Sequence, residues 1–293
     1  MRRGDLTNEE WARLKPHLPM SGQRGGRWAS HRSIINGILY RNRTGVPWRD
    51  LPARFGKWKT VYERHRRWSA DGTWDKVHAA VLADADAHGR IDWSMVSVDS
   101  TTCRAHQHAA GASKKLPRVP GKNARPTQHR LDEGLGRSRG GLTCKIHLAG
   151  EGGRRRLALL ITPGQWGDAP QLIPVMERIR VGRPGGGRPR TRPDHLGGDK
   201  AYSSLRNRRY LRRRQIMHTI PEPKNQRANR QRSGSKGGRP AGFDKTIYKR
   251  RSEVERTINA LKNFRAVATR FDKRVYVFQG TVTVAAIRLW LRR

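Results

Sequence analysis

Two aspartates and one glutamate, far apart along the chain, are the residues best suited by type and position to carry out chemistry. Asp99 ends a β-prone run, and Asp199 follows two glycines, whose missing side chains would let a ligand approach closely. Glu255 lies in a segment patterned as an amphipathic helix. Acids at the carboxyl ends of strands lie where open α/β sheets bind ligands. Three such carboxylates would suit two Mg²⁺ ions and phosphodiester chemistry, because hard cations prefer carboxylate oxygens.

The helical segment gives its two glutamates different environments. At about 100° per residue, one narrow helix face is shared by Tyr248, Arg251, Glu255 and Lys262. An apolar stripe borders that face, so Glu255 is expected beside buried surface, where a carboxylate needs a partner. Glu253 lies well away from both and is expected to be a solvated surface acid. For Glu255 the alternative to catalysis is an ion pair with Arg251, four positions earlier.

The composition indicates a polyanionic partner. The 293 residues suffice for one large domain or two ordinary ones, and 63 Lys and Arg against 23 Asp and Glu give a net charge of +40. Such an excess favours nucleic acid, and the helical first half of the chain would suit double-stranded DNA as that partner. A membrane is not expected, because no apolar run is long enough to span a bilayer. The first residues lack the apolar core of a secretory signal, so a cytoplasmic, nucleoid-associated location is expected.

Residues 1–90 are expected to form an all-helical, helix-turn-helix-like DNA-binding domain. A capping box at 7–10 predicts a first helix, and periodic apolar residues predict further helices over 31–42 and 57–70. Three cations of the last of these are expected to be exposed and to contact DNA: Arg64, Arg66 and Arg67. The alternative is a small helical bundle whose tryptophans are only core residues.

Residues 91–293 are expected to form an α/β domain, a mixed sheet flanked by helices. Strands are predicted at 95–100, 142–150, 156–162, 194–199 and 216–222, the second and third forming a hairpin. Helices are predicted at 170–180 and 203–214, and the C-terminal segment from Val275 is also expected to be helical. Basic flexible loops are expected near 111–140, 181–194 and 223–242.

Other residues suggest chemistry but have simpler explanations. Cys103, His106 and His108 could suggest zinc, yet no paired set of ligands follows at zinc-finger spacing. Cys103 and Cys144 are expected to be reduced thiols. Asp168 follows a predicted strand and could approach the metal site, or could cap the helix that follows it.

Three motifs in a fixed order are distinctive. They are VDST at 98–101, GDKAY at 198–202, and the spacing Y-x2-R-x3-E-x6-K from Tyr248 to Lys262. In this combination the chain closely resembles bacterial insertion-sequence transposases of the IS4 and IS5 superfamily, and the IS5 group within it. The resemblance covers nearly the whole chain, because residues 45–68, 105–112 and 264–273 are also similar to that group.

The resemblance implies a DDE enzyme with an RNase H-like catalytic core. Its catalytic and metal-binding residues would be Asp99, Asp199 and Glu255. The implied cofactor is Mg²⁺, as two ions for which Mn²⁺ can substitute. Residues implied to serve the active site or bind the DNA end are Tyr248, Arg251 and Lys262, with Lys200 as a weaker candidate. The implied reaction is metal-dependent cleavage at the terminal inverted repeats and transfer of the freed 3′-hydroxyl into target DNA, by a homodimer on DNA.

Two other functions remain open on sequence alone. A non-catalytic basic DNA-binding protein would draw all its function from the first half of the chain. An RNase H-like nuclease would cut DNA without joining it. Convergence of the three carboxylates in the fold separates catalysis from simple binding, and a strand-transfer assay separates joining from cutting.

Overall fold

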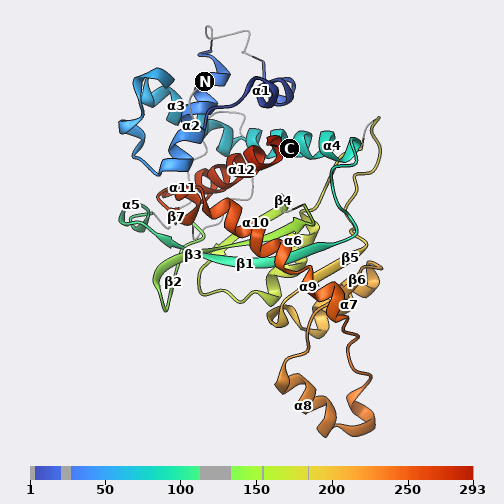
Figure 1. Cartoon of the computed structure of the whole chain (residues 1–293). Coiled ribbons are helices and arrows are strands. Elements are labelled where there is room, and N and C mark those ends of the chain that lie inside the picture. Colours follow the sequence, from blue (N-terminus) through green and yellow to red (C-terminus); the bar gives the residue numbers. More distant parts are fainter. Residues whose placement is uncertain (1–3, 21–27, 113–132, 154, 184, 293) are drawn as a thin grey trace.

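The structure is a computed structural model that describes residues 4–20, 28–112, 133–153, 155–183 and 185–292 (Figure 1). Its described N-terminal part contains α1 (Asn8–Leu14), α2 (His31–Thr44), α3 (Trp58–Ala70) and α4 (Thr73–Ala87). The expected capping box opens α1, because Thr7 Oγ1 accepts a hydrogen bond from Glu10 N at 3.1 Å and Glu10 Oε2 accepts one from Thr7 N at 2.8 Å. The helices predicted over 31–42 and 57–70 are confirmed as α2 and α3.

A mixed sheet forms the centre of the molecule. Its described strands are β1 (Val96–Ala105), β2 (Gly136–Ser138), β3 (Gly141–Glu151), β4 (Arg155–Pro163), β5 (His195–Gly198), β6 (Met217–Thr219) and β7 (Thr269–Arg270). β4, β3 and β1 are antiparallel neighbours, whereas β5 and β6 continue the sheet parallel to β1. The short strands β2 and β7 pair with β3 and β1. This order confirms the expected mixed sheet and the β3–β4 hairpin.

Helices cover both faces of the sheet, and each face has its own core. The helix α10 (Ser252–Lys262) packs on β1 and β3, and α6 (Leu172–Glu177) packs on β3 and β4. Side chains alternate along β1, so Val98 lies in the core with α6 and Cys103 lies in the core with α10. Asp99 is therefore on the α10 face, where Leu148 of β3 is its cross-strand neighbour.

The C-terminal helix α12 (Val275–Leu291) connects the N-terminal helices to the sheet, and its helical structure is confirmed. It packs against α3 and α4 and also against β4 (Figure 1). Trp68, Trp74 and Trp290 are buried in one continuous core with residues of β1 and β4. The N-terminal helices and the sheet thus share apolar packing. No helix of the described residues is both long enough and apolar enough to cross a membrane.

The remaining described helices are α5 (Gln107–Ala110), α7 (Leu205–Arg213), α8 (Lys224–Arg232), α9 (Lys245–Lys249) and α11 (Arg265–Ala268). The 3-10 turns are η1 (Lys15–His17), η2 (Trp48–Asp50), η3 (Ala53–Phe55), η4 (Ala169–Gln171), η5 (Lys200–Tyr202) and η6 (Gly234–Gly237).

The segments expected to be loops match that expectation only in part. Residues 113–132 of the first one lie outside the described residues, and β2 lies within its last part. The described part of 181–194 is irregular apart from one bridge, between Val181 and Arg190. The expectation for 223–242 is wrong, because it contains α8 and η6. Lys, Gln, Arg and Ala are good helix formers, and Pro223 stands at the N-cap before them. No residue of α8 is buried, and Figure 1 shows it on an arm that projects away from the sheet.

Close packing of α12 on α3 gives a first prediction, for Gly280→Ala. A Cβ at Gly280 would lie 2.0 Å from Ser69 Oγ and 2.9 Å from Ser69 Cβ, so the two helices must move apart. We expect the free energy of unfolding to fall by about 1–3 kcal/mol, although alanine is the better helix former. Urea unfolding measures it. Gly242→Ala is the control, because nothing lies within 4 Å of its added Cβ. Equal stabilities of the two variants would contradict the close packing.

Candidate active site

Asp99 and Asp199 lie side by side on neighbouring parallel strands. β1 and β5 pair through Val98 and Gly198, and each acid directly follows one of these partners. Asp99 Oδ1 accepts a hydrogen bond from the Ser100 backbone N–H at 2.8 Å. Asp199 caps η5, where its carboxylate accepts a hydrogen bond from Ala201 N at 2.9 Å. The sheet topology therefore brings the two acids together.

Two local expectations for these strands are wrong. The strand β1 does not end at Asp99 but continues to Ala105, because it keeps its pairing with β3. The glycine before Gly198 does not leave space for a ligand. A Cβ at Gly197 would lie 2.5 Å from Met95 Cε and 2.9 Å from Ser97 Oγ, so the close approach there is to the protein itself.

Arg251 connects Glu255 to Asp99. Its Nη1 lies 2.8 Å from Glu255 Oε1, and its Nη2 lies 3.6 Å from Asp99 Oδ2. The ion pair weighed from the sequence is therefore present, but the same guanidinium also faces the first aspartate. The Nε of Arg251 is buried and has no hydrogen-bond partner in the described structure. One cation thus bridges two of the three predicted acids.

The pKa of Asp99 is raised above its usual value. Burial is the largest cause, and the negative charges of Asp199 and Glu255 add to it. The Ser100 N–H and the Arg251 cation act in the opposite direction and lower the pKa. Asp99 therefore lies close enough to each of the other two carboxylates to be influenced by its charge.

The expectation that Glu253 is a solvated acid is wrong. Its side chain is 20% exposed, whereas that of Glu255 is 50% exposed. Glu253 Oε1 pairs with Arg250 Nε at 3.2 Å, and Arg250 also binds Asp92 at 2.7 Å. The expected helix is interrupted between α9 and α10, which changes the angular relation of residues on either side. Glu253 is the less exposed acid because its carboxylate is held against Arg250, which also pairs with Asp92.

The other predicted site residues lie around this pair of strands. The Tyr248 ring, on α9, is 6.0 Å from Arg251 Cζ. At the end of α10, Lys262 Nζ donates a hydrogen bond to the Thr102 carbonyl oxygen at 3.3 Å, three residues after Asp99 on β1. Lys200 is exposed and directly follows Asp199. These three residues therefore border the strands and the helix that carry the acids.

Asp168 does not take the capping role considered for it. Its side chain does not cap the following turn, and it accepts hydrogen bonds from Ser100 Oγ at 2.8 Å and Lys145 Nζ at 3.0 Å. His147 Nδ1 lies 3.6 Å away. Because Ser100 alternates with Asp99, this cluster lies on the opposite face of β1. The sequence reasoning missed Lys145 and His147, although their spacing of two along a predicted strand places them on one face.

The cysteine and histidine motif is split by the fold. Cys103 and Cys144 are buried free thiols, and they are cross-strand neighbours in the pairing of β1 with β3. His106 and His108 lie beyond the end of β1, where the His106 ring is 4.9 Å from the Phe271 ring. In the described part of the chain no group of three His, Cys, Asp or Glu is already arranged to hold a metal ion.

The three acids nevertheless have the chemistry that a hard divalent cation requires. All are carboxylates, which are preferred ligands of Mg²⁺ and Mn²⁺. Asp199 has no cation partner among the described residues, and only Arg251 pairs with the other two. The donor set therefore fits a divalent metal once Arg251 no longer bridges two of its members.

Of the three arginines predicted to contact DNA, only Arg67 is exposed. Arg64 is 7% exposed, with its Cζ 4.3 Å from the Trp28 ring centre and its Nη1 2.9 Å from His31 Nδ1. Arg66 is half-buried and pairs with Glu63 at 2.9 Å. The expectation of exposure is thus wrong for Arg64, because it lies three positions after Val61 on the buried face of α3.

Two known families match the chain. Residues 6–78 match the family described as "Putative transposase of IS4/5 family", and residues 94–290 match the family described as "Transposase DDE domain". The chain belongs to the DDE transposase family. This transposase is an enzyme of DNA transposition that cleaves DNA and transfers strands by phosphoryl transfer. Family membership also implies dependence on a divalent metal.

Relatives of the transposase include proteins of insertion elements. The Burkholderia cepacia "Insertion element IS402 uncharacterized 16.2 kDa protein" is 38% identical, over 39% of this chain and 80% of that protein. The Brucella ovis "Putative transposase for insertion sequence element IS6501" is 28% identical, over 52% of this chain and 100% of that protein. The solved pre-cleavage Mos1 transpososome covers 94% of this chain and 81% of its own at 10% identity, but its TM-score of 0.26 supports no argument.

The raised pKa of Asp99 gives a second prediction, for Asp99→Asn. A carboxyl whose folded-state pKa is raised binds protons more tightly when folded, so its ionisation destabilises the fold as pH rises through that pKa. In EDTA at neutral pH, we expect Asp99→Asn to unfold at a higher temperature than the wild type. The difference should disappear below about pH 4, where the unfolded carboxyl is also protonated. Asp50→Asn, at an exposed position, is the control and should change little. A lower unfolding temperature for Asp99→Asn than for the wild type at neutral pH would contradict the raised pKa of Asp99.

Proposed function

We propose that Asp99, Asp199 and Glu255 form the catalytic site of this transposase and hold two Mg²⁺ ions, for which Mn²⁺ can substitute. The observation that carries the proposal is the pairing of β1 with β5 beside the two aspartates, together with the Arg251 guanidinium that joins Asp99 to Glu255. When bound, such ions activate the attacking oxygen and stabilise the leaving oxygen of a phosphodiester. A water is the attacking group for cleavage, and the freed 3′-hydroxyl is the attacking group for joining.

The protein's own residues orient the DNA around this chemistry. The β1 and β5 backbones fix the positions of Asp99 and Asp199, while α10 presents Glu255 on a side chain that remains half exposed. Arg251 is paired with two of the acids and can exchange these carboxylate partners for phosphate oxygens. Residues that contribute further contacts to the DNA end are Tyr248, Lys262 and Lys200.

The DNA substrates are the terminal inverted repeats of an insertion sequence and a target duplex. The net charge of +40 supports binding along an extended length of DNA, with affinity that falls steeply as salt rises. Residues 1–90 form the domain that reads the repeats, with Arg67 and Arg66 as its contacts from α3. Two ends must be held together for joining, so the active form is a homodimer on DNA, associated with the nucleoid.

The test is a cleavage and strand-transfer assay. Duplex DNA carrying the element's ends is incubated with the transposase, a target plasmid and Mg²⁺ or Mn²⁺, and the control contains EDTA. We expect nicks or breaks at the ends and covalent joining to the plasmid only when the metal is present. Cleavage without joined product would favour a nuclease, and binding without cleavage would favour a non-catalytic DNA-binding protein.

A further inference from the structure

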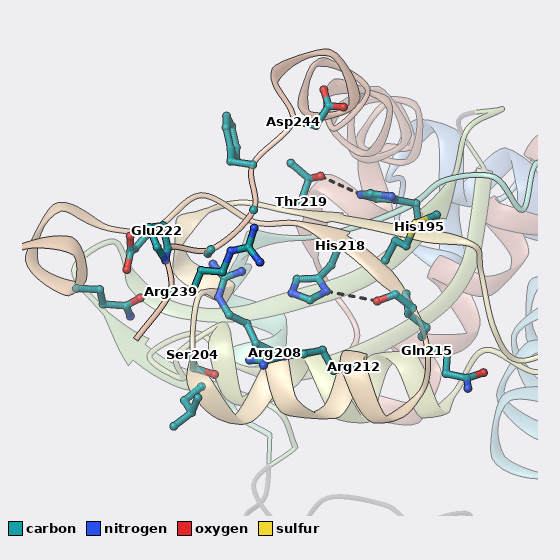
Figure 2. A pocket seen from close by; sticks show the side chains of 18 residues that line it. His195, Ser204, Arg208, Arg212, Gln215, His218, Thr219, Glu222, Arg239 and Asp244 are labelled. Carbon is teal, nitrogen blue, oxygen red and sulfur yellow. Dashed lines mark hydrogen bonds between the residues drawn. The ribbon is translucent and has the colours of Figure 1, made fainter. Parts of the chain in front are cut away.

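A large cavity lies beside the proposed active site, between α7, β6 and the segment that leads into α9 (Figure 2). Its volume is about 1010 Å³. Pockets that enclose small ligands usually measure ~300–1,000 Å³, so this cavity has room for at least one nucleotide. None of the three proposed catalytic acids lines it, so it is a separate site.

The walls of the cavity carry an excess of positive charge. Arg208 and Arg212 come from α7, and Arg239 comes from the opposite segment, with Arg208 and Arg239 directed toward the same space in Figure 2. Arg212 and Arg239 have no ion-pair partner in the described structure. The two acids of the lining are already engaged. Glu222 pairs with Arg230 at 3.0 Å, and Asp244 accepts hydrogen bonds from backbone N–H groups of α9. Arg212 and Arg239 are therefore available to an anionic ligand, whereas Arg208 Nη2 already donates hydrogen bonds to Ser203 Oγ at 3.0 Å and to the Ile220 carbonyl oxygen at 2.8 Å.

The same cavity exposes apolar side chains. Phe243, Met217 and Leu205 are 44%, 64% and 59% exposed, and they are three of the five large hydrophobic residues that are exposed in the described part of the chain. Exposed apolar side chains that are scattered singly over a surface need no explanation, but a group of them in one cavity indicates a binding surface. An exposed aromatic ring beside arginines is the combination that binds unpaired nucleic-acid strands, because bases stack on the ring while phosphates bind the cations.

A short series of contacts links the cavity to the catalytic acids. The Phe243 ring lies 5.0 Å from the Tyr248 ring, and the Arg251 Cζ lies 6.0 Å from that same Tyr248 ring. Arg251 in turn reaches Asp99. On the other side, η5 and the start of α7 follow Asp199 directly. A DNA strand leaving the acids would therefore pass Tyr248 and reach the cavity.

We propose that this cavity binds an unpaired stretch of DNA strand next to the point of cleavage. Arg208, Arg212 and Arg239 bind its phosphates, and a base stacks on Phe243. Bases in a duplex stack on one another and offer no free face to the ring, so the cavity prefers unpaired DNA. The inference rests on the proposed function, since it takes the three acids as the point of cleavage.

The experiment compares single-stranded and duplex DNA of the same sequence, each with a fluorescent label, by anisotropy titration at fixed salt. We expect Phe243→Ala to weaken single-strand binding by about 5- to 150-fold, the scale of one lost base stack, and to leave duplex binding nearly unchanged. Phe243→Trp keeps a stacking ring and should retain the wild-type preference. Arg212→Gln should weaken single-strand binding and reduce the slope of log affinity against log salt by roughly 0.7.

A matched control lies on the same helix. Arg209 is an exposed arginine of α7 that does not line the cavity, so Arg209→Gln should change single-strand affinity much less than Arg212→Gln does. Equal losses from the two arginine variants, or unchanged single-strand binding by Phe243→Ala, would overturn the inference. Parallel cleavage assays keep the two proposals apart. If the wild type cleaves ends with Mg²⁺ and Phe243→Ala binds single strands normally, only the cavity assignment fails. If the wild type never cleaves, the proposed function fails.

Discussion

Asp99→Ala, Asp199→Ala and Glu255→Ala are each expected to abolish DNA cleavage while DNA binding is retained. Loss of one electrostatic group at a transition state commonly lowers the rate by ~10²–10³-fold, and loss of a carboxylate that also holds the metal should lower it further. Binding persists because the net charge of +40 comes from residues spread over the whole chain. Gel-based cleavage and anisotropy on the same DNA measure the two effects separately.

Glu253→Ala is the matched control for this set. It removes a carboxylate from the same turn of α10, but that carboxylate contacts Arg250 rather than Arg251. We expect the variant to stay active. Activity that survived Glu255→Ala and was lost in Glu253→Ala would show that the wrong glutamate has been assigned to the site.

The second large effect is expected on stability, from Asp272→Asn. Asp272 pairs with Arg41 of α2 at 3.1 Å, and the two side chains are only 5% and 3% exposed. Thr281 Oγ1 also donates a hydrogen bond to Asp272, at 3.0 Å. Neutralising the acid leaves the arginine cation buried without its partner, which typically destabilises a protein by about 3–5 kcal/mol. Urea unfolding should show this loss directly.

An exposed ion pair provides the comparison. Glu63 pairs with Arg66 at 2.9 Å, but both side chains are more than a third exposed, so Glu63→Gln should cost ~0–1 kcal/mol. If Asp272→Asn unfolded at the same urea concentration as Glu63→Gln, the buried pair would not have the role assigned to it between the N-terminal helices and the segment before α12.

Local signals were sufficient to predict most of the elements that carry the site. The capping box at Thr7, the β3–β4 hairpin and the β-prone runs before Asp99 and Asp199 each depend on neighbouring residues. The adjacency of the two aspartates follows from the parallel pairing of β1 with β5, in which each acid comes directly after a paired residue, although only Asp199 lies at a strand end.

The errors came from features that depend on tertiary packing. The break between α9 and α10 falls at Arg250 and Arg251, with no Gly or Pro to mark it. The low exposure of Glu253 depends on Arg250, which also pairs with Asp92 far away in the sequence. Arg64 stacks on Trp28, a partner more than thirty positions earlier that no periodicity identifies. The contact between Asp168 and Lys145 likewise joins two separate segments.

The central claim is that three acids, remote in sequence, share one divalent-metal site. The most direct test is a crystal of the transposase grown with saturating Mn²⁺, with the ion located by its anomalous scattering. We predict anomalous density bounded by Asp99, Asp199 and Glu255, with Arg251 no longer bridging two of them. Density absent from that position, with Arg251 still paired to both Asp99 and Glu255, would contradict the account.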